Sequence, residues 1–139
     1  MGEFSYIDWL RQQTPPAPRV LLGPGDDAAV VAWAGAPPML VTTDVLMDGT
    51  DFLLNEIGPE RVGRKAMAVN LSDIAAMAGR SVAALVGVVL PKTGGRPLAE
   101  GLYRGLRALA DEFDTPIVGG DTNSWDGALV VSVTVIGEV

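Results

Sequence analysis

The sequence predicts a single α+β domain in which helices cover one face of a sheet. The chain has 139 residues, 48% of them hydrophobic, which suffices for one core but not for two ordinary domains. Apolar residues recur at helical spacing in some segments and form short or alternating runs in others. The resulting order of elements, α-β-β-α-β-α-β-β, is typical of an α+β architecture.

The N-terminal part is predicted as a helix followed by two strands. Residues 3–13 suit a short amphipathic helix because apolar side chains recur at helical spacing, and it ends before the Pro-rich connector 14–18. The apolar runs 28–33 and 39–43 are typical of strands. The Gly- and Pro-containing segment between them indicates a turn.

The rest of the chain is predicted as two helices and three strands. Pro59 suits the first turn of a buried, alanine-rich helix. Four regularly spaced leucines mark the second helix, and alternation of valines with Ser132 and Thr134 marks a half-buried strand. The expected elements are a helix over 59–79, a strand over 85–90, a helix ending near Phe113, a strand over 116–118 and a strand over 129–136.

Composition excludes several classes of function. A net charge of -7, from 17 acidic and 10 basic residues, disfavours binding to nucleic acid or to an anionic membrane. The absence of Cys and His removes disulfides, thiolate nucleophiles, the usual zinc sites and a Ser-His-Asp triad. The longest apolar run, 82–90, is too short to span a membrane, and the first residues lack a signal-peptide pattern. We therefore expect a cytoplasmic protein.

The first of four acid-bearing segments is Gly23-Pro24-Gly25-Asp26-Asp27-Ala28. Its Gly-x-Gly-x-x-Ala spacing superficially matches a dinucleotide-binding fingerprint, but two carboxylates would repel a pyrophosphate and no helix is expected to follow. Mg²⁺ would make the same acids useful, because it takes one or two carboxylates together with phosphate oxygens. A plain Asp-rich turn is the alternative.

The second and third segments offer further hard oxygen ligands. Thr42-Thr43-Asp44 lies at the end of the strand predicted over 39–43, where side-chain oxygens are free to coordinate a cation. The alternative is that these side chains cap a helix or a turn. Asn70 and Asp73 are three residues apart and share a face of an alanine-rich helix, where a buried polar pair requires a partner. The alternative is an exposed polar stripe, or a cap formed by Ser72.

The fourth segment, Gly119-Gly120-Asp121-Thr122, follows a short apolar strand. Paired glycines allow a ligand to approach the backbone, whose N–H groups can bind phosphate, and Asp121 would add a metal ligand. A simple Gly-Gly turn is the alternative. The four segments together lack a general base, a nucleophile and a zinc ligand but are rich in magnesium ligands. They favour phosphoryl transfer, in which positioning and charge neutralisation supply most of the catalysis and no catalytic side chain is expected.

These motifs, in this order, resemble thiamine-monophosphate kinase. The wider group is the ATP-binding superfamily of aminoimidazole-ribonucleotide synthetase, selenophosphate synthetase and the hydrogenase-maturation dehydratase. The most specific stretches are Gly2-Glu3-Phe4 and Asn70-Leu71-Ser72-Asp73-Ile74-Ala75-Ala76-Met77. The resemblance covers essentially residues 1–139, and it corresponds to the family's N-terminal domain. It implies a mixed, largely antiparallel sheet like that of the N-terminal domain of aminoimidazole-ribonucleotide synthetase.

The resemblance also implies a function and a site. Family members use MgATP to phosphorylate thiamine monophosphate to thiamine diphosphate, and their N-terminal domains pair through their sheets as a homodimer. Gly120, Asp121 and Tyr103 would lie at the nucleotide. The residues implied as ligands of several Mg²⁺ ions are Asp27, Thr42, Thr43, Asp44, Asp73 and Asp121.

Two departures from the family pattern bear on the substrate. Asp51 occupies the position of a family His that contacts substrate, so the resemblance implies Asp51 as the contact to the acceptor. Its carboxylate would repel a phosphorylated acceptor unless a metal ion or the thiazolium cation lies close. The family's C-terminal domain, which supplies further contacts, is absent from this chain. An ATP-using enzyme of the superfamily with another acceptor, and a domain that only dimerises without catalysis, are therefore the alternatives to the kinase.

Overall fold

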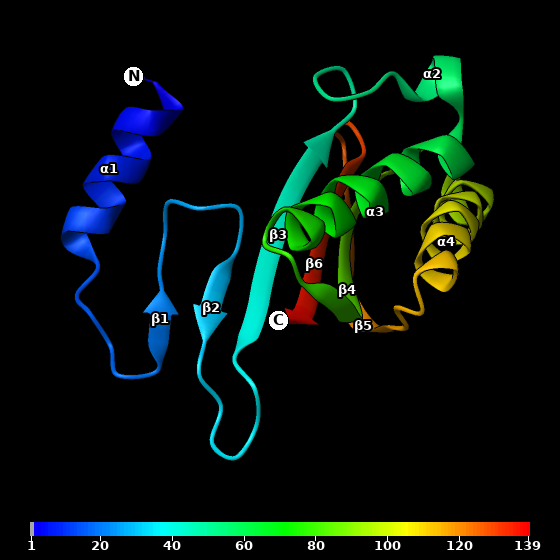
Figure 1. Ribbon diagram of the computed structural model, residues 1–139. Coiled ribbons are helices and arrows are strands. Elements are labelled where there is room, and N and C mark those ends of the chain that lie inside the picture. Colours follow the sequence, from blue (N-terminus) through cyan, green and yellow to red (C-terminus); the bar gives the residue numbers. More distant parts are fainter. Residues whose placement is uncertain (1) are drawn as a thin grey trace.

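The computed structural model describes residues 2–139, and it shows a six-stranded sheet with helices α3 and α4 packed on one face (Figure 1). The strand order is β1-β2-β3-β6-β4-β5. Among the described residues the strand pairs are antiparallel except β4 with β5. The elements are α1 (Glu3–Gln13), β1 (Val20–Leu22), β2 (Ala29–Val31), β3 (Met39–Met47), α2 (Leu54–Ile57), α3 (Pro59–Ala76), β4 (Arg80–Pro91), α4 (Gly95–Glu112), β5 (Ile117–Trp125) and β6 (Val130–Glu138). The predicted α+β class, with a mixed and largely antiparallel sheet, is confirmed.

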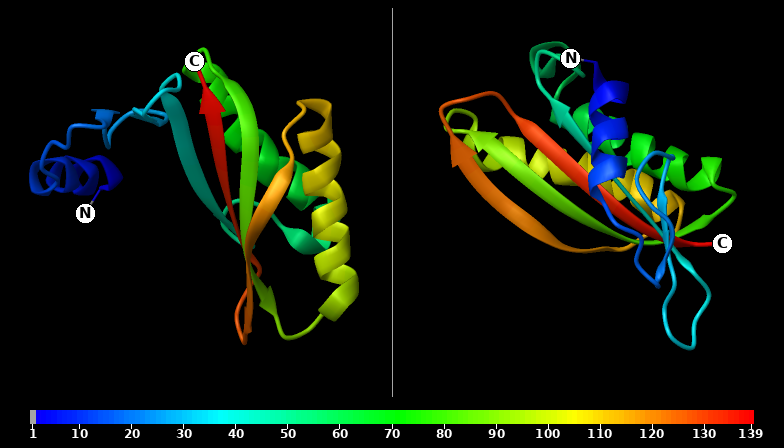
Figure 2. Two further views of the ribbon diagram at one scale, coloured as in Figure 1. Left: turned by 90° about the horizontal axis from the view of Figure 1, so that it is seen from below. Right: turned by 90° about the vertical axis from the view of Figure 1, so that its left-hand side faces the viewer.

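The two faces of the sheet differ in their surroundings. Figure 2 shows α3 and α4 on one side, the covered face, and no helix against the opposite side of β3, β6, β4 and β5, the open face. Strand β6 follows this division, because Val131, Val133 and Val135 are fully buried while Ser132 and Thr134 point to the open face. Apolar side chains on alternate positions therefore place the core between the sheet and the two helices.

Helices α3 and α4 cross at glycines. A Cβ added to Gly63 would lie 2.2 Å from the main-chain oxygen of Leu102, and one added to Gly105 would lie 1.9 Å from that of Glu60. Only hydrogen side chains permit this backbone contact. The close crossing fixes α4 beside α3, and the apolar side of α4 faces β4 and β5.

Two boundaries near the predicted site differ from the sequence-based expectation. Strand β3 continues to Met47, so that Asp44 lies inside the strand and not at its end. Strand β5 runs through Trp125, so that Gly119-Gly120-Asp121-Thr122 belongs to a strand and not to a turn. Both extensions arise from long-range pairing, with β6 and with β4 respectively. The short elements β1 and α2 were not predicted, because three or four residues carry too little periodicity.

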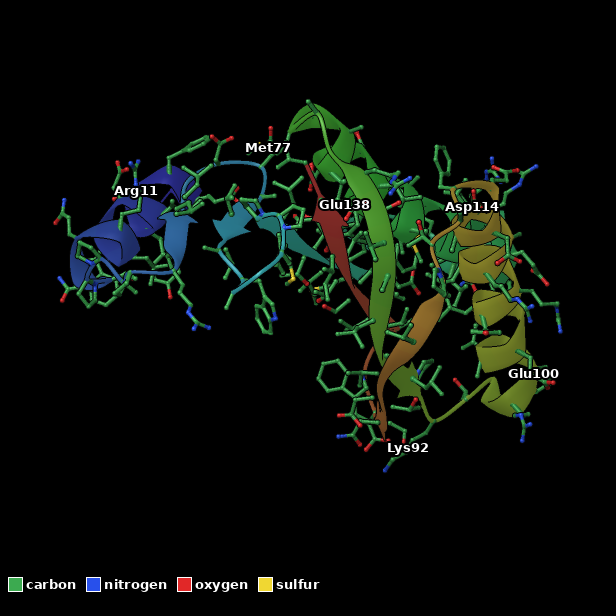
Figure 3. All side chains as sticks on the ribbon, turned by 60° about the horizontal axis from the view of Figure 1, so that its bottom comes forward. Arg11, Met77, Lys92, Glu100, Asp114 and Glu138 are labelled. Carbon is green, nitrogen blue, oxygen red and sulfur yellow. The ribbon has the colours of Figure 1, made fainter. Side chains whose placement is uncertain are left out.

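The N-terminal arm, comprising α1, β1 and β2, lies to one side of the main body (Figure 1). Within the described part of the chain, α1 buries none of its side chains. Figure 3 shows Arg11 of α1 at the opposite end of the molecule from Glu100 of α4. The Arg11 side chain packs against Gly25, where an added Cβ would lie 3.0 Å from its Cδ atom. None of the helices in residues 2–139 has the length and hydropathy to cross a bilayer.

Candidate functional site

The strongest electrostatic feature is a pair of carboxylates, Asp44 on β3 and Asp73 on α3. Asp44 occupies the covered face between the buried Thr42 and Leu46, and α3 carries Asp73 to it. Partial burial, a side-chain hydrogen bond with Asp73 and the charge of Asp73 raise the pKa of Asp44 from its usual 3.8 to about 6. Two acids held this closely, and only partly hydrated, repel each other unless a proton or a cation lies between them.

The loop before β2 joins this pair through Thr42. The Thr42 hydroxyl donates a hydrogen bond of 3.0 Å to the main-chain oxygen of Asp27, and Thr42 is only 7% exposed. Asp26 turns the loop by accepting the Asp27 N–H at 2.8 Å. The structure thus brings Thr42, Asp44 and Asp73 to one side of the covered face, with the main chain of Asp27 beside Thr42. Among the described residues the Asp27 carboxylate does not join Asp44 and Asp73 closely enough to hold one metal ion.

Asn70 lies on α3 one turn before Asp73. Its side chain is fully buried, and its Nδ2 donates to the main-chain oxygen of Ala66 at 2.9 Å. Its Oδ1 has no hydrogen-bond partner among residues 2–139. The sequence predicted that Asn70 and Asp73 each require a partner. Asp73 has one in Asp44, whereas Asn70 has a partner for its Nδ2 but none for its Oδ1 among the described residues.

Asp51 is held in the loop that follows β3. Its Oδ2 accepts the N–H of Met47 at 2.8 Å, and Lys65 of α3 donates to its main-chain oxygen. Asp48 accepts the N–H of Leu54 at 3.0 Å and closes the other side of the loop. One oxygen of the Asp51 carboxylate, Oδ2, is therefore engaged in a hydrogen bond that holds the loop.

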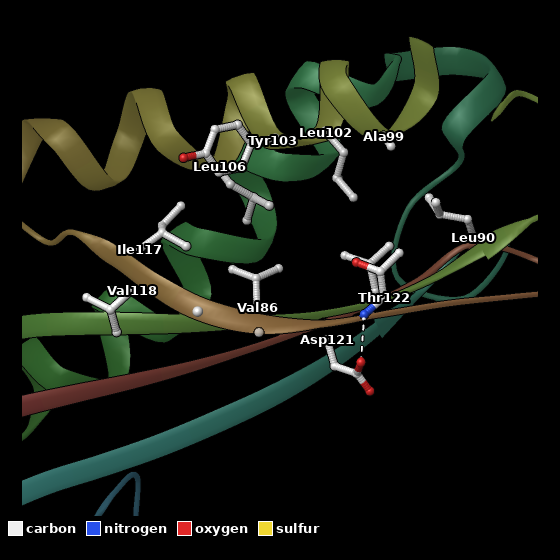
Figure 4. Close-up of a pocket in the computed structure, with 13 residues that line it drawn as sticks. Val86, Leu90, Ala99, Leu102, Tyr103, Leu106, Ile117, Val118, Asp121 and Thr122 are labelled. Atoms are coloured by element: carbon white, nitrogen blue, oxygen red, sulfur yellow. Dashed lines mark hydrogen bonds between the residues drawn. The ribbon is translucent and has the colours of Figure 1, made fainter. Parts of the chain in front are cut away.

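Thr43 and Asp121 belong to the open face. Thr43 donates to the main-chain oxygen of Val133 at 3.1 Å and accepts from Thr134 at 3.0 Å. Asp121 pairs in register with Gly87, three strands from β3, and Figure 4 shows its side chain on the side of β5 away from α4. Three strand spacings amount to about 14 Å. In residues 2–139 no three acidic side chains lie close enough together to hold one metal ion, so the structure does not bring Asp121 to Asp44 and Asp73.

A cleft of about 590 Å³ lies between α4 and strands β4 and β5 (Figure 4). Its walls are largely aliphatic, and Tyr103 of α4 and Thr122 of β5 add hydroxyl groups. Gly119 and Gly120 line its floor. A Cβ added to Gly120 would lie 1.8 Å from the main-chain oxygen of Val86, so this position accepts no side chain.

Sequence reasoning missed two parts of this region. The aliphatic wall of the cleft, which includes Val86 and Leu102, has the same apolar pattern as the core and carries no separate signal. Lys65 was not singled out either, because its contact with Asp51 joins residues 14 positions apart. Tyr103 and Gly120, both of which were expected to lie at the nucleotide, line the same cleft.

The fold and the sequence place the chain in a known class. Residues 25–139 match the model of the AIR synthase related protein, N-terminal domain, and the chain therefore belongs to that family. Within the family, the chain is similar to thiamine-monophosphate kinases. The relative from Rhodopirellula baltica is 40% identical over 142 residues, and the match covers 97% of this chain and 45% of the relative. The relative from Mycobacterium tuberculosis H37Rv is 44% identical over 143 residues, covering 100% of this chain and 41% of the relative.

Solved structures show the same likeness. AaThiL complexed with AMPPCP and TMP matches with a TM-score of 0.87 and 33% identity, covering 99% of this chain and 42% of that one. Thiamine-monophosphate kinase from Stenotrophomonas maltophilia matches with a TM-score of 0.70 and 38% identity, covering 100% of this chain and 43% of that one. PurL of T. maritima shares the fold at 14% identity, with a TM-score of 0.74 over 95% of this chain and 23% of PurL. The chain thus spans less than half the length of the relatives it matches.

Proposed function

We propose that this chain is the MgATP-binding half of a thiamine-monophosphate kinase. The reaction transfers the γ-phosphoryl group of ATP to the phosphate of thiamine monophosphate and yields thiamine diphosphate and ADP. The Asp44–Asp73 pair carries the proposal, because a bound cation would relieve the repulsion between the two carboxylates. The chain is also similar to kinases of this kind. AaThiL, a related protein, binds AMPPCP and TMP. Since ATP is the co-substrate, we place the activity in the cytoplasm.

The donor set fits Mg²⁺. Asp44 and Asp73 offer hard oxygen ligands, and burial together with the nearness of Asp73 raises the pKa of Asp44. The buried Oδ1 of Asn70 lacks a donor among the described residues. When bound, Mg²⁺ would neutralise phosphate charge and align the reacting groups. The proposed ligands are Asp27, Thr42, Thr43, Asp44, Asp73 and Asp121.

The cleft under α4 is the proposed nucleotide site. Its volume of about 590 Å³ and its aliphatic walls suit a small organic ligand. Tyr103 and Thr122 offer hydroxyl groups for orientation. Gly119 and Gly120 carry no side chains, so a ligand in the cleft can approach the main chain of β5 closely. Asp121 also borders the cleft, because β5 is an edge strand. Gly120, Asp121 and Tyr103 are therefore the proposed nucleotide contacts.

The open face is the proposed surface of a homodimer. It exposes Val45 and Val118 to 59% and 62%, together with Met47 and Leu85. Apolar side chains spread over a flat sheet are typical of a surface that another protein covers. Asp121 lies on this face and out of reach of Asp44 in its own chain, so we assign Asp121 to a site that the second copy completes.

Asp51 is the proposed contact to the acceptor. Its Oδ2 is bonded to the N–H of Met47, while Lys65 donates to its main-chain oxygen. The Met47 N–H and the Lys65 ammonium reduce the repulsion that a free carboxylate would exert on a phosphorylated acceptor.

Calorimetry and a kinase assay test the proposed function. We expect wild type to bind AMPPCP only with Mg²⁺ present, and Asp44→Asn to lose most of that binding because a ligand carboxylate becomes a neutral amide. Asp126→Asn, an exposed acid outside the proposed site, is the matched control. Binding of AMPPCP without Mg²⁺, or equal binding by Asp44→Asn, would contradict the assignment. Formation of thiamine diphosphate from thiamine monophosphate tests the acceptor separately.

A further inference from the structure

Asn70 is an unusual residue for its position in the fold. It is fully buried on α3, among apolar side chains that face the sheet. One half of its amide is satisfied, because Nδ2 donates to Ala66 one turn earlier. The other half, Oδ1, has no donor among residues 2–139. A buried acceptor without a donor destabilises the fold by its lost hydration, so an apolar residue of the same shape would pack better here.

Asn70 and Asp73 are three residues apart on α3, so their side chains are neighbours on the helix surface. Because Nδ2 of Asn70 is bonded back to Ala66, Oδ1 is the free end of the amide. Side chains on a helix lean toward its N-terminus, so the Asp73 carboxylate lies over the turn that contains Asn70. Asp73 is itself hydrogen-bonded to Asp44 across the interface between α3 and β3. Asn70 is thus the helix neighbour of Asp73, and Asp73 in turn contacts Asp44.

The three groups differ in depth. Asp44 and Asp73 are half-buried at the rim of the interface, whereas Asn70 is enclosed. A cation held by the two carboxylates at the rim would keep several bound waters, as Mg²⁺ does in most protein sites. An inward-facing water of that shell needs an acceptor, and Oδ1 of Asn70 is an acceptor in need of a donor.

We propose that Asn70 is a positioning residue of the metal site, whose Oδ1 accepts a hydrogen bond from a water molecule bound to the Mg²⁺ ion at Asp44 and Asp73. The inference rests on the proposed function for the presence of that ion. Acceptors one step removed from a metal fix the orientation of its ligands, and their loss commonly weakens metal binding by about 10–100-fold.

Titration of metal-free protein with MgCl₂, without nucleotide, tests this role. Asn70→Leu removes the acceptor and keeps the volume, and Asn70→Asp keeps an acceptor oxygen. Met67→Leu, a fully buried change one turn away on the same helix, is the control for disturbed packing. We expect the Mg²⁺ dissociation constant to rise by about tenfold or more in Asn70→Leu, to remain near the wild-type value in Met67→Leu, and not to rise in Asn70→Asp, whose added charge favours the cation.

Thermal unfolding supplies a second readout that a merely structural role would not produce. We expect Asn70→Leu to melt in EDTA at or above the temperature of wild type, and to gain less from added Mg²⁺. If Asn70→Leu does not fold, Asn70→Ala is titrated in its place, with the same rise expected. A dissociation constant of the folded variant within twofold of wild type overturns the inference, as does an equal weakening in Met67→Leu. Wild type that does not bind Mg²⁺ overturns both this inference and the metal assignment, whereas kinase activity decides the function independently.

Discussion

At the scale of single residues, Asp44 is a group whose present surroundings oppose its charged form. Its partial burial and, after that, its neighbour Asp73 raise its pKa to about 6, so the proton is bound more tightly in the folded chain than in the unfolded one. The free energy of unfolding therefore loses a contribution as the pH rises from about 4 to about 6, and the full cost is present above pH 6. The close pair of acids therefore lowers the stability of the metal-free protein.

The first prediction concerns this cost. Asp44→Asn should raise the free energy of unfolding in EDTA at pH 7.5, because the amide removes the repulsion. Two pKa units correspond to roughly 3 kcal/mol, which solvent screening of this partly exposed group reduces to about 1 kcal/mol. Urea denaturation at pH 4.5 and 7.5 measures the effect, and the gain should shrink at the lower pH. The exposed Asp126→Asn should change little, and a destabilised Asp44→Asn would contradict the assignment.

The second prediction concerns Gly120, which marks the contact of β5 with β4. Gly120→Ala should lower the free energy of unfolding by about 2–3 kcal/mol and weaken AMPPCP binding. The reason is the 1.8 Å separation between the added Cβ and the Val86 oxygen, which forces β5 away from β4 at the cleft. The adjacent Gly119→Ala is the matched control, because its Cβ would meet Leu85 at an ordinary 3.4 Å. Equal effects at both positions would contradict this explanation.

At the scale of elements, the crossing of α3 and α4 shapes the cleft. The two helices touch through Gly63 and Gly105, so α4 cannot move closer to the sheet on that side. Its apolar stripe, which includes Leu102 and Leu106, both packs on the core and lines the cleft. The glycine crossing therefore helps decide how wide the cleft is.

The third prediction tests this crossing by the sign of a stability change. Within an isolated helix, Gly→Ala stabilises by up to about 1 kcal/mol. Gly105→Ala should instead destabilise by about 2–3 kcal/mol, because its Cβ would lie 1.9 Å from the Glu60 oxygen. Thermal and urea unfolding measure the change, with the exposed Ser72→Ala of α3 as control. Stabilisation of the Gly105 variant would show that the helices are farther apart than described.

At the scale of the whole molecule, this domain has surfaces that call for partners. The open face exposes apolar side chains on β3, β4 and β5, and the proposed ligands lie on both faces of the sheet. The chain also spans only 45% and 41% of two related kinases. A complete site is therefore expected only when the second copy, and the rest of a full-length enzyme, are in place.

The fourth prediction addresses the second copy. Val45→Asp should raise the dissociation constant of the homodimer by about 100-fold, because an unpaired charge buried in an interface costs about 3 kcal/mol or more. Sedimentation velocity measures the shift to monomer, and circular dichroism checks that the fold is retained. Leu21→Asp on β1 changes a side chain of nearly equal exposure, 58% against 59%, away from the open face. A monomeric wild type, or dissociation by both variants, would contradict the proposed interface.

The sequence by itself determined the local structure and the kinds of ligand. Periodicity located the helix that begins at Pro59 and the alternating strand ending near Ile136, because backbone geometry imposes a repeat on buried side chains. The clustering of acids and glycines indicated phosphate and magnesium chemistry, because these preferences belong to the residues themselves.

Only the tertiary structure decided which of those residues meet. Asp44 finds Asp73 because α3 packs on the covered face, and Asp121 is kept from both by the strand order β3-β6-β4-β5. Pairing with β4 also extended the predicted strand over 116–118 through the segment that was expected to be a loop, since hydrogen bonds from a neighbouring strand outweigh a weak local preference. Contacts between distant segments depend on strand register and on packing, and the spacing of apolar residues along the sequence does not report either one.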